Sequence, residues 1–295
     1  MARQRYRLLR YALLAALVVA GLWLRRVEPT EASASLTAWR PWARSTVVTL
    51  YFLRGRTLFP VSRRLSATAD LPRATLQSLI DGPSNESGLT NPIPPGVRIQ
   101  SLRITGDIAR VDLSGEIHGE SETNLAETSV VETMTALPGI DSVALSVNGK
   151  PAGEPAQRQP LLYFTSDDGL VAIPVSAATP QAVVDAYLAS PADAQFTGLP
   201  RDVRLLNYEY DPAKRLASLN FSYASSIRTM AIEKPERIRF ALLGLIASLT
   251  DFRQVRAVQL DFEGRTRLGL GQCSDLLRTP QPRPELLNDE RLLGR

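Results

Sequence analysis

Few residues of this chain have the types and spacing that catalysis or metal binding requires. His118 is its one histidine and Cys273 its one cysteine. Numbers alone do not exclude a serine–histidine–aspartate triad on His118, but no Gly-x-Ser-x-Gly elbow accompanies it. A zinc site needs three or four ligands, mostly nitrogen or sulfur, which these two distant residues do not supply. We therefore expect no catalytic, cofactor-binding or metal-binding residues, and interpret His118 as a loop residue.

Two carboxylates, Asp112 and Glu116, are the best pair for general acid–base chemistry. On a continuous strand, residues i and i+4 lie about 13 Å apart on one face. That distance exceeds the roughly 5–9.5 Å between the paired carboxylates of glycosidases. A bend at Gly115 would shorten it, so a catalytic pair stays an alternative. The first interpretation is structural: Asp112 and Ser114 satisfy backbone groups where a strand ends.

Two further groups of residues have both a structural and a functional interpretation. Asp167-Asp168-Gly169 lacks the further oxygen ligands of a calcium loop, so it predicts a hairpin turn. Four aromatic residues recur at alternate positions of two expected strands, which favours packing in a core. A platform for a glycan or peptide is the alternative for this aromatic set, which is Tyr208, Tyr210, Phe221 and Tyr223.

The elements that must position these residues are encoded twice. Three blocks recur in the same order, with offsets of 112, 108 and 115 residues. A period this long matches a domain of roughly 100–150 residues and exceeds the roughly 20–50 residues of a solenoid repeat. We therefore predict a tandem duplication, residues 46–151 and 161–266, joined by a connector at 152–160. The recurring blocks are 50–52 with 162–164, 109–114 with 217–222, and 143–150 with 258–265.

Each repeat has the same expected order of elements, ββ-α-ββ-α-β. This order predicts an α+β fold in which helices pack on one face of a mostly antiparallel sheet. Two helices are expected to begin at Asp70 and at Thr179-Pro180, and two more are expected to cover residues 124–137 and 235–250. Alternation of apolar residues predicts the strands. They are 47–52, 57–61, 97–104, 108–113 and 143–147 in the first repeat, and 203–210, 216–223 and 258–262 in the second.

Residues 1–26 have the layout of an export signal. Four arginines precede and two follow an uncharged apolar run from Tyr11 to Leu24. As a helix this run is about 21 Å long, short of the roughly 30 Å hydrocarbon core, although Leu8, Leu9 and a snorkelling Arg10 narrow the gap. An uncleaved signal anchor and a cleaved signal peptide are both open. The arginine distribution favours a cytoplasmic N-terminus and a body outside the cytoplasm, at the cell membrane or secreted.

The charge balance excludes a basic surface for nucleic-acid binding on the body of the protein. The chain has a net charge of +4, but the first 26 residues hold six arginines and no acid, which leaves −2 for the rest. A linker at 27–45 follows, where Trp39 and Trp42 are either interfacial anchors or ordinary linker and core-edge residues. The Pro- and Arg-rich tail at 267–295 is expected to be mostly disordered. Cys273 within it is expected to be a thiol near solvent, and a single cysteine forms no internal disulfide.

Four segments of the first repeat resemble the GerMN domain of sporulation and spore-germination proteins. The resemblance covers roughly residues 46–265 and is weaker in the second repeat, where Glu263-Gly264-Arg265 replaces the Asn-Gly-Lys run. It implies an envelope-associated, non-enzymatic domain with a fold similar to the ring-building motif of secretion systems. The matching segments are Ile93-Pro94-Pro95-Gly96-Val97-Arg98, Ala109-Arg110-Val111-Asp112-Leu113-Ser114-Gly115-Glu116, Leu137-Pro138-Gly139-Ile140-Asp141 and Val147-Asn148-Gly149-Lys150-Pro151.

The export signal, the repeat and the lack of a reactive cluster together predict a function. We expect a membrane-tethered, extracytoplasmic scaffold that docks on envelope proteins or packs in an oligomeric assembly. No cofactor and no nucleic acid is expected as a ligand. The alternative is a protein that binds cell-wall glycan or peptide, with a carboxylate-dependent hydrolase as the weaker version of that alternative.

Overall fold

The computed structural model describes residues 45–115, 117, 124–167, 169–189 and 196–293. Residues 46–295 belong to one compact unit. Within the described ranges, no helix combines the length and the apolar character needed to cross a bilayer. The following sequence predictions lie outside the described residues: the run from Tyr11 to Leu24, and Trp39, Trp42, Glu116, His118 and Asp168.

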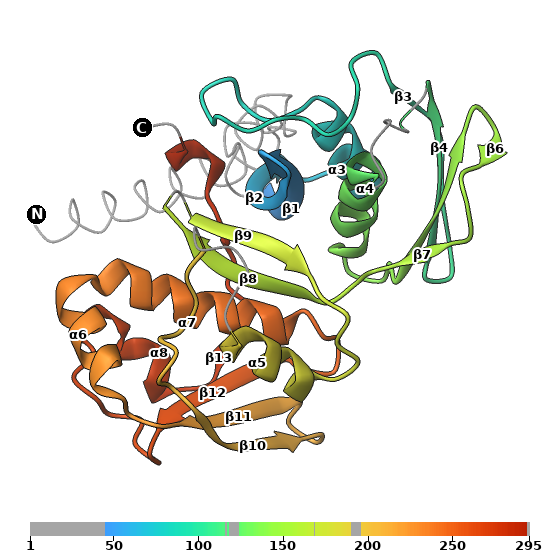
Figure 1. Cartoon of the computed structure of the whole chain (residues 1–295). Coiled ribbons are helices and arrows are strands. Elements are labelled where there is room, and N and C mark those ends of the chain that lie inside the picture. Colours follow the sequence, from blue (N-terminus) through green and yellow to red (C-terminus); the bar gives the residue numbers. More distant parts are fainter. Residues whose placement is uncertain (1–44, 116, 118–123, 168, 190–195, 294–295) are drawn as a thin grey trace, which may run out of the picture. The chain divides into compact units, whose positions relative to one another are not determined.

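The first repeat contains the elements that its sequence predicts. Asp70 accepts a hydrogen bond from the Arg73 amide at 3.0 Å, and Asn124 accepts one from the Glu127 amide at 3.1 Å, so both helix starts are confirmed. The elements are β1 (Ser45–Arg54), β2 (Thr57–Ser66), α3 (Leu71–Ile80), β3 (Arg98–Thr105), β4 (Ile108–Ser114), α4 (Leu125–Thr135), β5 (Ser142–Val147), β6 (Lys150–Pro151) and β7 (Ala156–Gln157) (Figure 1).

The second repeat follows the same order, with one helix that the sequence did not predict. That helix, α6, has no side-chain cap and buries only Ile227 and Ala231. The spacing of its apolar residues therefore gives only a weak helix signal in the sequence. Pro235 then starts α7 as predicted. The elements are β8 (Leu161–Ser166), β9 (Gly169–Pro174), α5 (Pro180–Leu188), β10 (Leu205–Asp211), β11 (Leu216–Phe221), α6 (Ser225–Glu233), α7 (Pro235–Thr250) and β12 (Ala257–Phe262).

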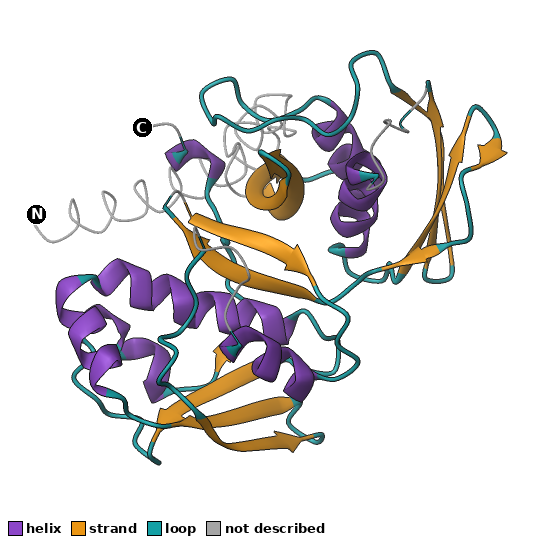
Figure 2. Ribbon diagram, in the orientation of Figure 1, coloured by secondary structure: helices purple, strands orange, loops and turns teal. Residues whose placement is uncertain are grey.

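Each repeat has its own sheet with helices on one side, which confirms the α+β class (Figure 2). The strand orders are β3-β4-β5-β6, with β7 also on β5, and β10-β11-β12-β13, in which β13 (Gln281–Pro282) comes from the tail. The pair β3–β4 is antiparallel and β4–β5 is parallel, and β10–β11 and β11–β12 repeat this arrangement. The sheets are therefore mixed, because a helical crossover returns the chain to the same end before β5 and β12.

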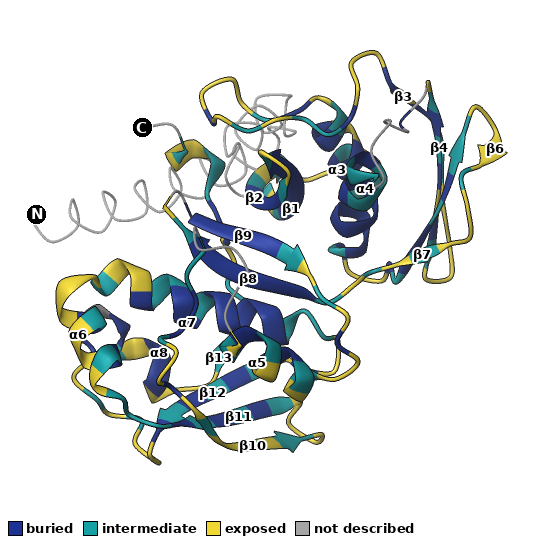
Figure 3. Ribbon diagram, viewed as in Figure 1, coloured by how far each residue is buried: buried dark blue, intermediate teal, exposed yellow. Residues whose placement is uncertain are grey.

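The first hairpin of each repeat does not join that repeat's own sheet, which corrects the prediction of one sheet per repeat. These hairpins join across the repeats in one sheet of order β1-β2-β9-β8, in which Leu58 of β2 lies opposite Ala172 of β9. Runs of consecutive residues in both hairpins are buried, so both faces of each hairpin are covered, as in the dark strands of Figure 3; these runs are 50–53, 58–62, 161–165 and 169–172. A two-stranded ribbon with two apolar faces is marginal on its own, so pairing with its counterpart completes it.

The open edges of this shared sheet are closed by the helices α4 and α7. On β1, the Thr133 hydroxyl accepts a hydrogen bond from the Tyr51 amide at 3.1 Å, and the Ser129 hydroxyl donates to the Tyr51 carbonyl. On β8, the Ser248 hydroxyl accepts from the Tyr163 amide at 2.9 Å. The backbone groups of an unpaired strand edge can pair with another chain. Here hydrogen bonds from helix side chains occupy some of these groups instead.

The C-terminal tail corrects the expectation of disorder. It forms η2 (Gly271–Cys273), α8 (Asp275–Arg278), β13 (Gln281–Pro282) and η3 (Glu290–Leu292). Several of its apolar side chains, including Leu270 and Leu277, are fully buried. Cys273 is buried too, and burial raises the pKa of its thiol to about 11, so it is no thiol near solvent. A composition rich in proline and arginine predicts disorder, but leucine side chains of this segment pack in the core.

Candidate functional site at the junction of the repeats

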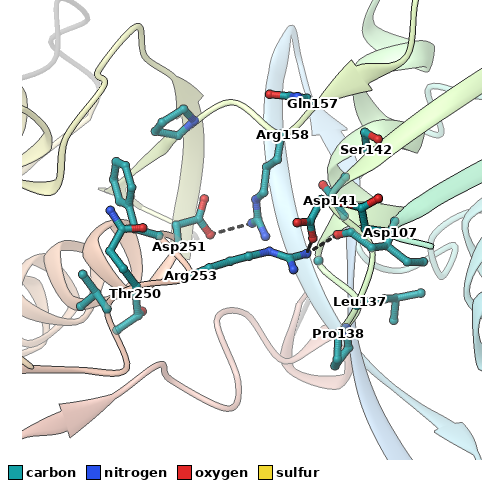
Figure 4. A pocket seen from close by; sticks show the side chains of 18 of the residues that line it. Asp107, Leu137, Pro138, Asp141, Ser142, Gln157, Arg158, Thr250, Asp251 and Arg253 are labelled. Atoms are coloured by element: carbon teal, nitrogen blue, oxygen red, sulfur yellow. Dashed lines mark hydrogen bonds and ion pairs between the residues drawn. The ribbon is translucent and has the colours of Figure 1, made fainter. Parts of the chain in front are cut away.

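A pocket of about 740 Å³ lies where the two repeats meet (Figure 4). Its walls come from the C-terminal ends of α4 and α7 and from the connector between the repeats. Arg215 and Arg283 line it as well. Figure 4 shows side chains of both repeats pointing toward one another here, and the main lining segments are 135–142, 157–160 and 250–255.

Arginines gather at this pocket because two helices end there. The last carbonyl groups of a helix have no partner within it and carry partial negative charge, which favours nearby cations. Arg283 donates to the Ala247 carbonyl of α7 at 3.2 Å. Arg253, just after α7, donates to the Ile140 carbonyl of the first repeat at 2.5 Å and forms an ion pair with Asp141. These guanidinium groups therefore already have partners within the chain.

In the wall of the pocket, one carboxylate contacts two arginines from distant segments. Asp251 caps the C-terminus of α7, and its side chain is only 2% exposed. Its Oδ1 atom lies 2.6 Å from Arg158 of the connector and 2.7 Å from Arg283 of the tail. Asp251 thus ties together the second repeat, the connector and the tail.

Two tyrosines at equivalent positions of the repeats meet in the same cluster. The hydroxyl oxygens of Tyr51 and Tyr163 are 2.7 Å apart, and both side chains are fully buried. Arg158 donates to the Tyr51 hydroxyl at 3.0 Å, and Arg283 donates to the Tyr163 hydroxyl at 3.1 Å. Burial raises the pKa of both tyrosines, so they stay protonated at neutral pH.

Glu132 of α4 completes the cluster from the side of the first repeat. Its side chain is 2% exposed, and its Oε2 atom lies 3.4 Å from Nε of Arg158. Burial raises its pKa to about 7, and the nearby charge of Arg158 lowers the pKa by a smaller amount. Desolvation of a carboxylate here outweighs one long ion pair. Glu132 is therefore a titratable group inside the junction between the repeats.

The chemistry of this junction is pairing of charges within the chain. Its arginines are occupied by carboxylates, helix carbonyls and tyrosine hydroxyls, and the lining offers no cysteine or histidine. Among the described residues, no group of three or more histidine, cysteine or acidic residues could hold a metal ion. The arrangement is suited to holding two repeats together.

The sequence reasoning did not find Glu132, Arg158, Asp251 or Arg283. A signal was present for Glu132, a charged residue within the otherwise uncharged run from Val130 to Thr135 of α4. The recurrence of Tyr51 as Tyr163 is visible in the sequence, but the contact between the two side chains is not. No local pattern connects the connector, the end of α7 and the tail.

Asp112, the carboxylate considered for acid–base chemistry, lies on β4 of the first repeat. Its Oδ1 atom accepts a hydrogen bond from the Gly149 amide at 2.9 Å, and Ser114 accepts one from the Arg98 amide at 3.0 Å. Their predicted role in satisfying backbone groups is confirmed. Asn220, the counterpart of Asp112 in the second repeat, accepts from the Gly264 amide at 3.2 Å. The same amide-capping role therefore recurs in both repeats.

The other residues considered from sequence lie apart from the junction. Asp167 forms an exposed ion pair with Arg237 at 2.8 Å in the turn before β9. Phe221 is fully buried against Phe262. Tyr208 and Tyr210 lie opposite buried residues of β11 and pack against the core. Tyr223 also packs on this core, and no open row of aromatic rings results.

Comparison with known proteins gives a family and a structural match that spans both repeats. The family model for sporulation and spore germination matches residues 49–153 and 161–268. Among solved structures, the tandem GerMN domains of the sporulation protein GerM from Bacillus subtilis match with a TM-score of 0.65 at 17% identity, over 83% of this chain and 99% of that one. At this identity the likeness shows a shared fold.

Two shorter structures also match. The first GerMN domain of GerM from Bacillus subtilis has 21% identity and a TM-score of 0.33, covering 38% of this chain and 98% of that one. A putative lipoprotein from Clostridium perfringens has 22% identity and a TM-score of 0.29, covering 39% and 89%. The search of curated proteins found no match.

Proposed function

Since the chain belongs to the sporulation and spore germination family, whose model matches both repeats, we propose that it is a membrane-tethered scaffold outside the cytoplasm. Its tandem body docks on protein partners of the cell envelope and catalyses no reaction. The similarity to tandem GerMN domains supports a role of the kind that GerM has in sporulation.

The observation that carries this proposal is how the two repeats are joined. They share a sheet, a buried cluster of ions and tyrosines, and a tail that contacts both. The charged groups at the junction pair with one another, so they stabilise the body and leave no activated nucleophile or base. A body of this kind presents two similar domains side by side to partners.

Tethering is supported by the sequence of the leader. The apolar run from Tyr11 to Leu24, with arginines on both sides, is the feature that directs export. We expect the full chain, made in bacterial cells, to sediment with the membrane fraction. A C-terminal tag should be cut by protease added to cells whose outer layers have been removed, without lysis.

A matched variant tests the leader itself. Leu17→Arg places a charge in the middle of the apolar run, at a cost of about 2.5–3.5 kcal/mol for insertion. We expect this variant to stay in the cytoplasm with its tag protected, whereas the similar exchange Leu286→Arg, at an exposed site of the body, leaves export unchanged. A wild-type chain whose tag is protected in intact cells would contradict the proposal.

Partner docking has its own test. Photo-crosslinking residues on the outer faces of the two sheets should capture envelope proteins in living cells, and mass spectrometry identifies them. Binding to purified cell wall without any captured protein would favour the glycan-binding alternative. The packing of Tyr208 and Tyr210 against the core does not favour that alternative, because a sugar platform needs exposed aromatic faces.

A further inference from the structure

The sheets β3-β4-β5 and β10-β11-β12 each have one face turned away from their helices (Figure 1). On β4, Val111 and Leu113 are buried on the helix side, so Arg110 and Asp112 lie on the outer face. The same alternation on β11 places Ser218 and Asn220 outside. These four residues are exposed or half-buried, so both sheet surfaces are uncovered among the described residues.

The outer face of the first repeat is basic. Arg98, Arg103 and Arg110 lie on it and are exposed, and Asp112 is its one carboxylate. Arg103 of β3 lies directly opposite Arg110 of β4. Like charges at directly opposed positions destabilise an antiparallel pair. Neither arginine has an ion-pair partner among the described residues.

The outer face of the second repeat is acidic. Glu209 and Asp211 of β10 and Asp261 of β12 lie on it. Arg204 precedes β10 at the end of this face, and Lys214 forms an ion pair with Asp211 at 3.1 Å. Burial raises the pKa of Asp261, but the pKa of Asp211 is lowered by its hydrogen bonds and ion pair with Lys214. The face therefore has an excess of negative charge.

The two faces can be compared position by position because both repeats carry the same irregularity. The register shifts between Ile99 and Ser101 on β3, and between Leu205 and Asn207 on β10. Counted from this bulge, Arg103 of the first repeat corresponds to Glu209 of the second. The same bulges twist the free edges of β3 and β10, which disfavours edge-to-edge pairing and leaves the sheet faces as contact surfaces.

We propose that the basic outer face of β3-β4-β5 in one copy docks on the acidic outer face of β10-β11-β12 in a second copy. The partner is another molecule of this chain, joined head to tail. This inference rests on the proposed scaffold function, for which it names one partner. Two different faces meet, so the contact is heterologous and extends to a closed ring or an open row of molecules.

The size of the faces predicts how strong the contact is. Three strands of about seven residues cover roughly 14 by 24 Å, or about 340 Å². Stable complexes bury about 800 Å² on each partner, so this contact is weak between molecules free in solution. Attachment of many copies to one membrane raises their local concentration and makes such a contact effective. Salt should weaken it, because charges separated by more than about 3 Å are screened at 1 M.

Charge reversal tests the proposal on the full chain, kept soluble with a non-ionic detergent and followed by fluorescence-detected sedimentation. The wild-type chain is expected to self-associate at low salt and to dissociate at 1 M salt. On the residues named, Arg103→Glu changes the net charge of the first face from +2 to 0, and Glu209→Arg changes that of the second face from −1 to +1. Each variant alone should associate at least about tenfold more weakly than the wild type.

Mixing the two variants gives the sharpest outcome. The acidic second-repeat face of Arg103→Glu can dock on the basic first-repeat face of Glu209→Arg, so an equal mixture should form pairs that do not extend. The double variant combines a neutral first face with a basic second face, so it should associate no more strongly than either single variant. The control reversals Arg73→Glu on α3 and Glu86→Arg in the following loop, both exposed, should leave self-association unchanged.

Three results would overturn the inference. They are a wild-type chain that stays monomeric at low salt, single variants that associate as the wild type does, and a mixture that forms no pairs. The proposed function fails on other grounds, namely a body retained in the cytoplasm or no envelope protein captured by crosslinking. A chain that captures other proteins but stays monomeric would therefore reject the inference alone.

Discussion

At the scale of single residues, Asp251 has the largest consequence for the junction. It is the closest carboxylate to both Arg158 and Arg283, at 2.6 and 2.7 Å. Removing one partner of a buried ion pair leaves an uncompensated charge and typically costs about 3–5 kcal/mol. We expect Asp251→Asn to lower the free energy of unfolding by about that amount, measured by urea denaturation at pH 7.

The exposed pair of Arg239 and Asp275, 3.2 Å apart, provides a matched control. Asp275→Asn removes a carboxylate from a solvent-exposed ion pair, which contributes about 0–1 kcal/mol. Similar effects of the two substitutions would show that the cluster around Asp251 is not buried in solution.

Glu132 gives the junction a dependence on pH. Burial raises its folded-state pKa to about 7, above the ordinary value of 4.5, so the folded state binds the proton more tightly than the unfolded state. The contribution of Glu132 to stability is therefore fully present below about pH 4.5 and is lost as pH rises through about 7. Glu132→Gln keeps the shape of the protonated form and should remove this loss.

The expected result is specific in sign and in pH window. At pH 8 Glu132→Gln should be more stable than the wild type, by up to about 3 kcal/mol, and at pH 4.5 the two should be equal. Urea denaturation across pH 4.5–8 measures the difference. Glu127→Gln, on the same helix and less buried, is the control. A constant difference at every pH would contradict a titrating Glu132.

At the scale of elements, the crossing of α7 over β8 depends on one glycine. A Cβ atom at Gly244 would clash with the Tyr163 carbonyl oxygen. Alanine normally stabilises a helix by about 1 kcal/mol relative to glycine, whereas overpacking with a backbone clash costs about 1–3 kcal/mol or more. We expect Gly244→Ala to destabilise the protein although alanine has the better helix propensity. The measurement is the melting temperature, which should fall.

Gly269 serves as the control because a Cβ atom there meets nothing within 4 Å. Gly269→Ala should leave the melting temperature within error of the wild type. Increased stability of Gly244→Ala would mean that α7 does not close the edge of β8 as described. In the first repeat, Ser129 occupies the corresponding position of α4, and its hydroxyl binds the Tyr51 carbonyl instead.

At the scale of the whole molecule, the tail fastens one repeat to the other. The buried side chain of Asn288 donates to the Pro60 carbonyl of β2 at 2.6 Å and to the Leu170 carbonyl of β9 at 2.8 Å, and it accepts from the Leu170 amide at 2.8 Å. Glu290 forms a second link, with Arg63 of β2 at 2.5 Å. One segment of the tail thus bridges strands of both repeats.

Asn288→Ala should weaken the joining of the two repeats. It leaves three buried backbone groups without partners, and each costs about 1–3 kcal/mol. We expect the described body to unfold in a single transition in the wild type, and Asn288→Ala to lower its midpoint in urea. Glu285→Ala, at an exposed site of the same tail, should not. Two separate wild-type transitions would show that the repeats fold independently.

The sequence by itself determined the elements and their duplication. Helix caps such as Asp70 and Thr179, the proline that starts α7, and the alternating strands are local signals, because they depend on backbone geometry within a few residues. The amide-capping role of Asp112 was predictable for the same reason. The tandem order of the repeats followed from recurrence alone, and the family model matches the same two regions.

Only the tertiary structure decided how the two repeats are joined. That β2 pairs with β9, that Tyr51 meets Tyr163, and that Asp251 holds Arg158 and Arg283 are contacts between residues about 30 to 115 positions apart. Hydrophobic periodicity specifies which face of a strand is buried but not which strand covers it. The charged cluster forms because three chain segments arrive together at the ends of α4 and α7, and no pattern within any one segment encodes that meeting.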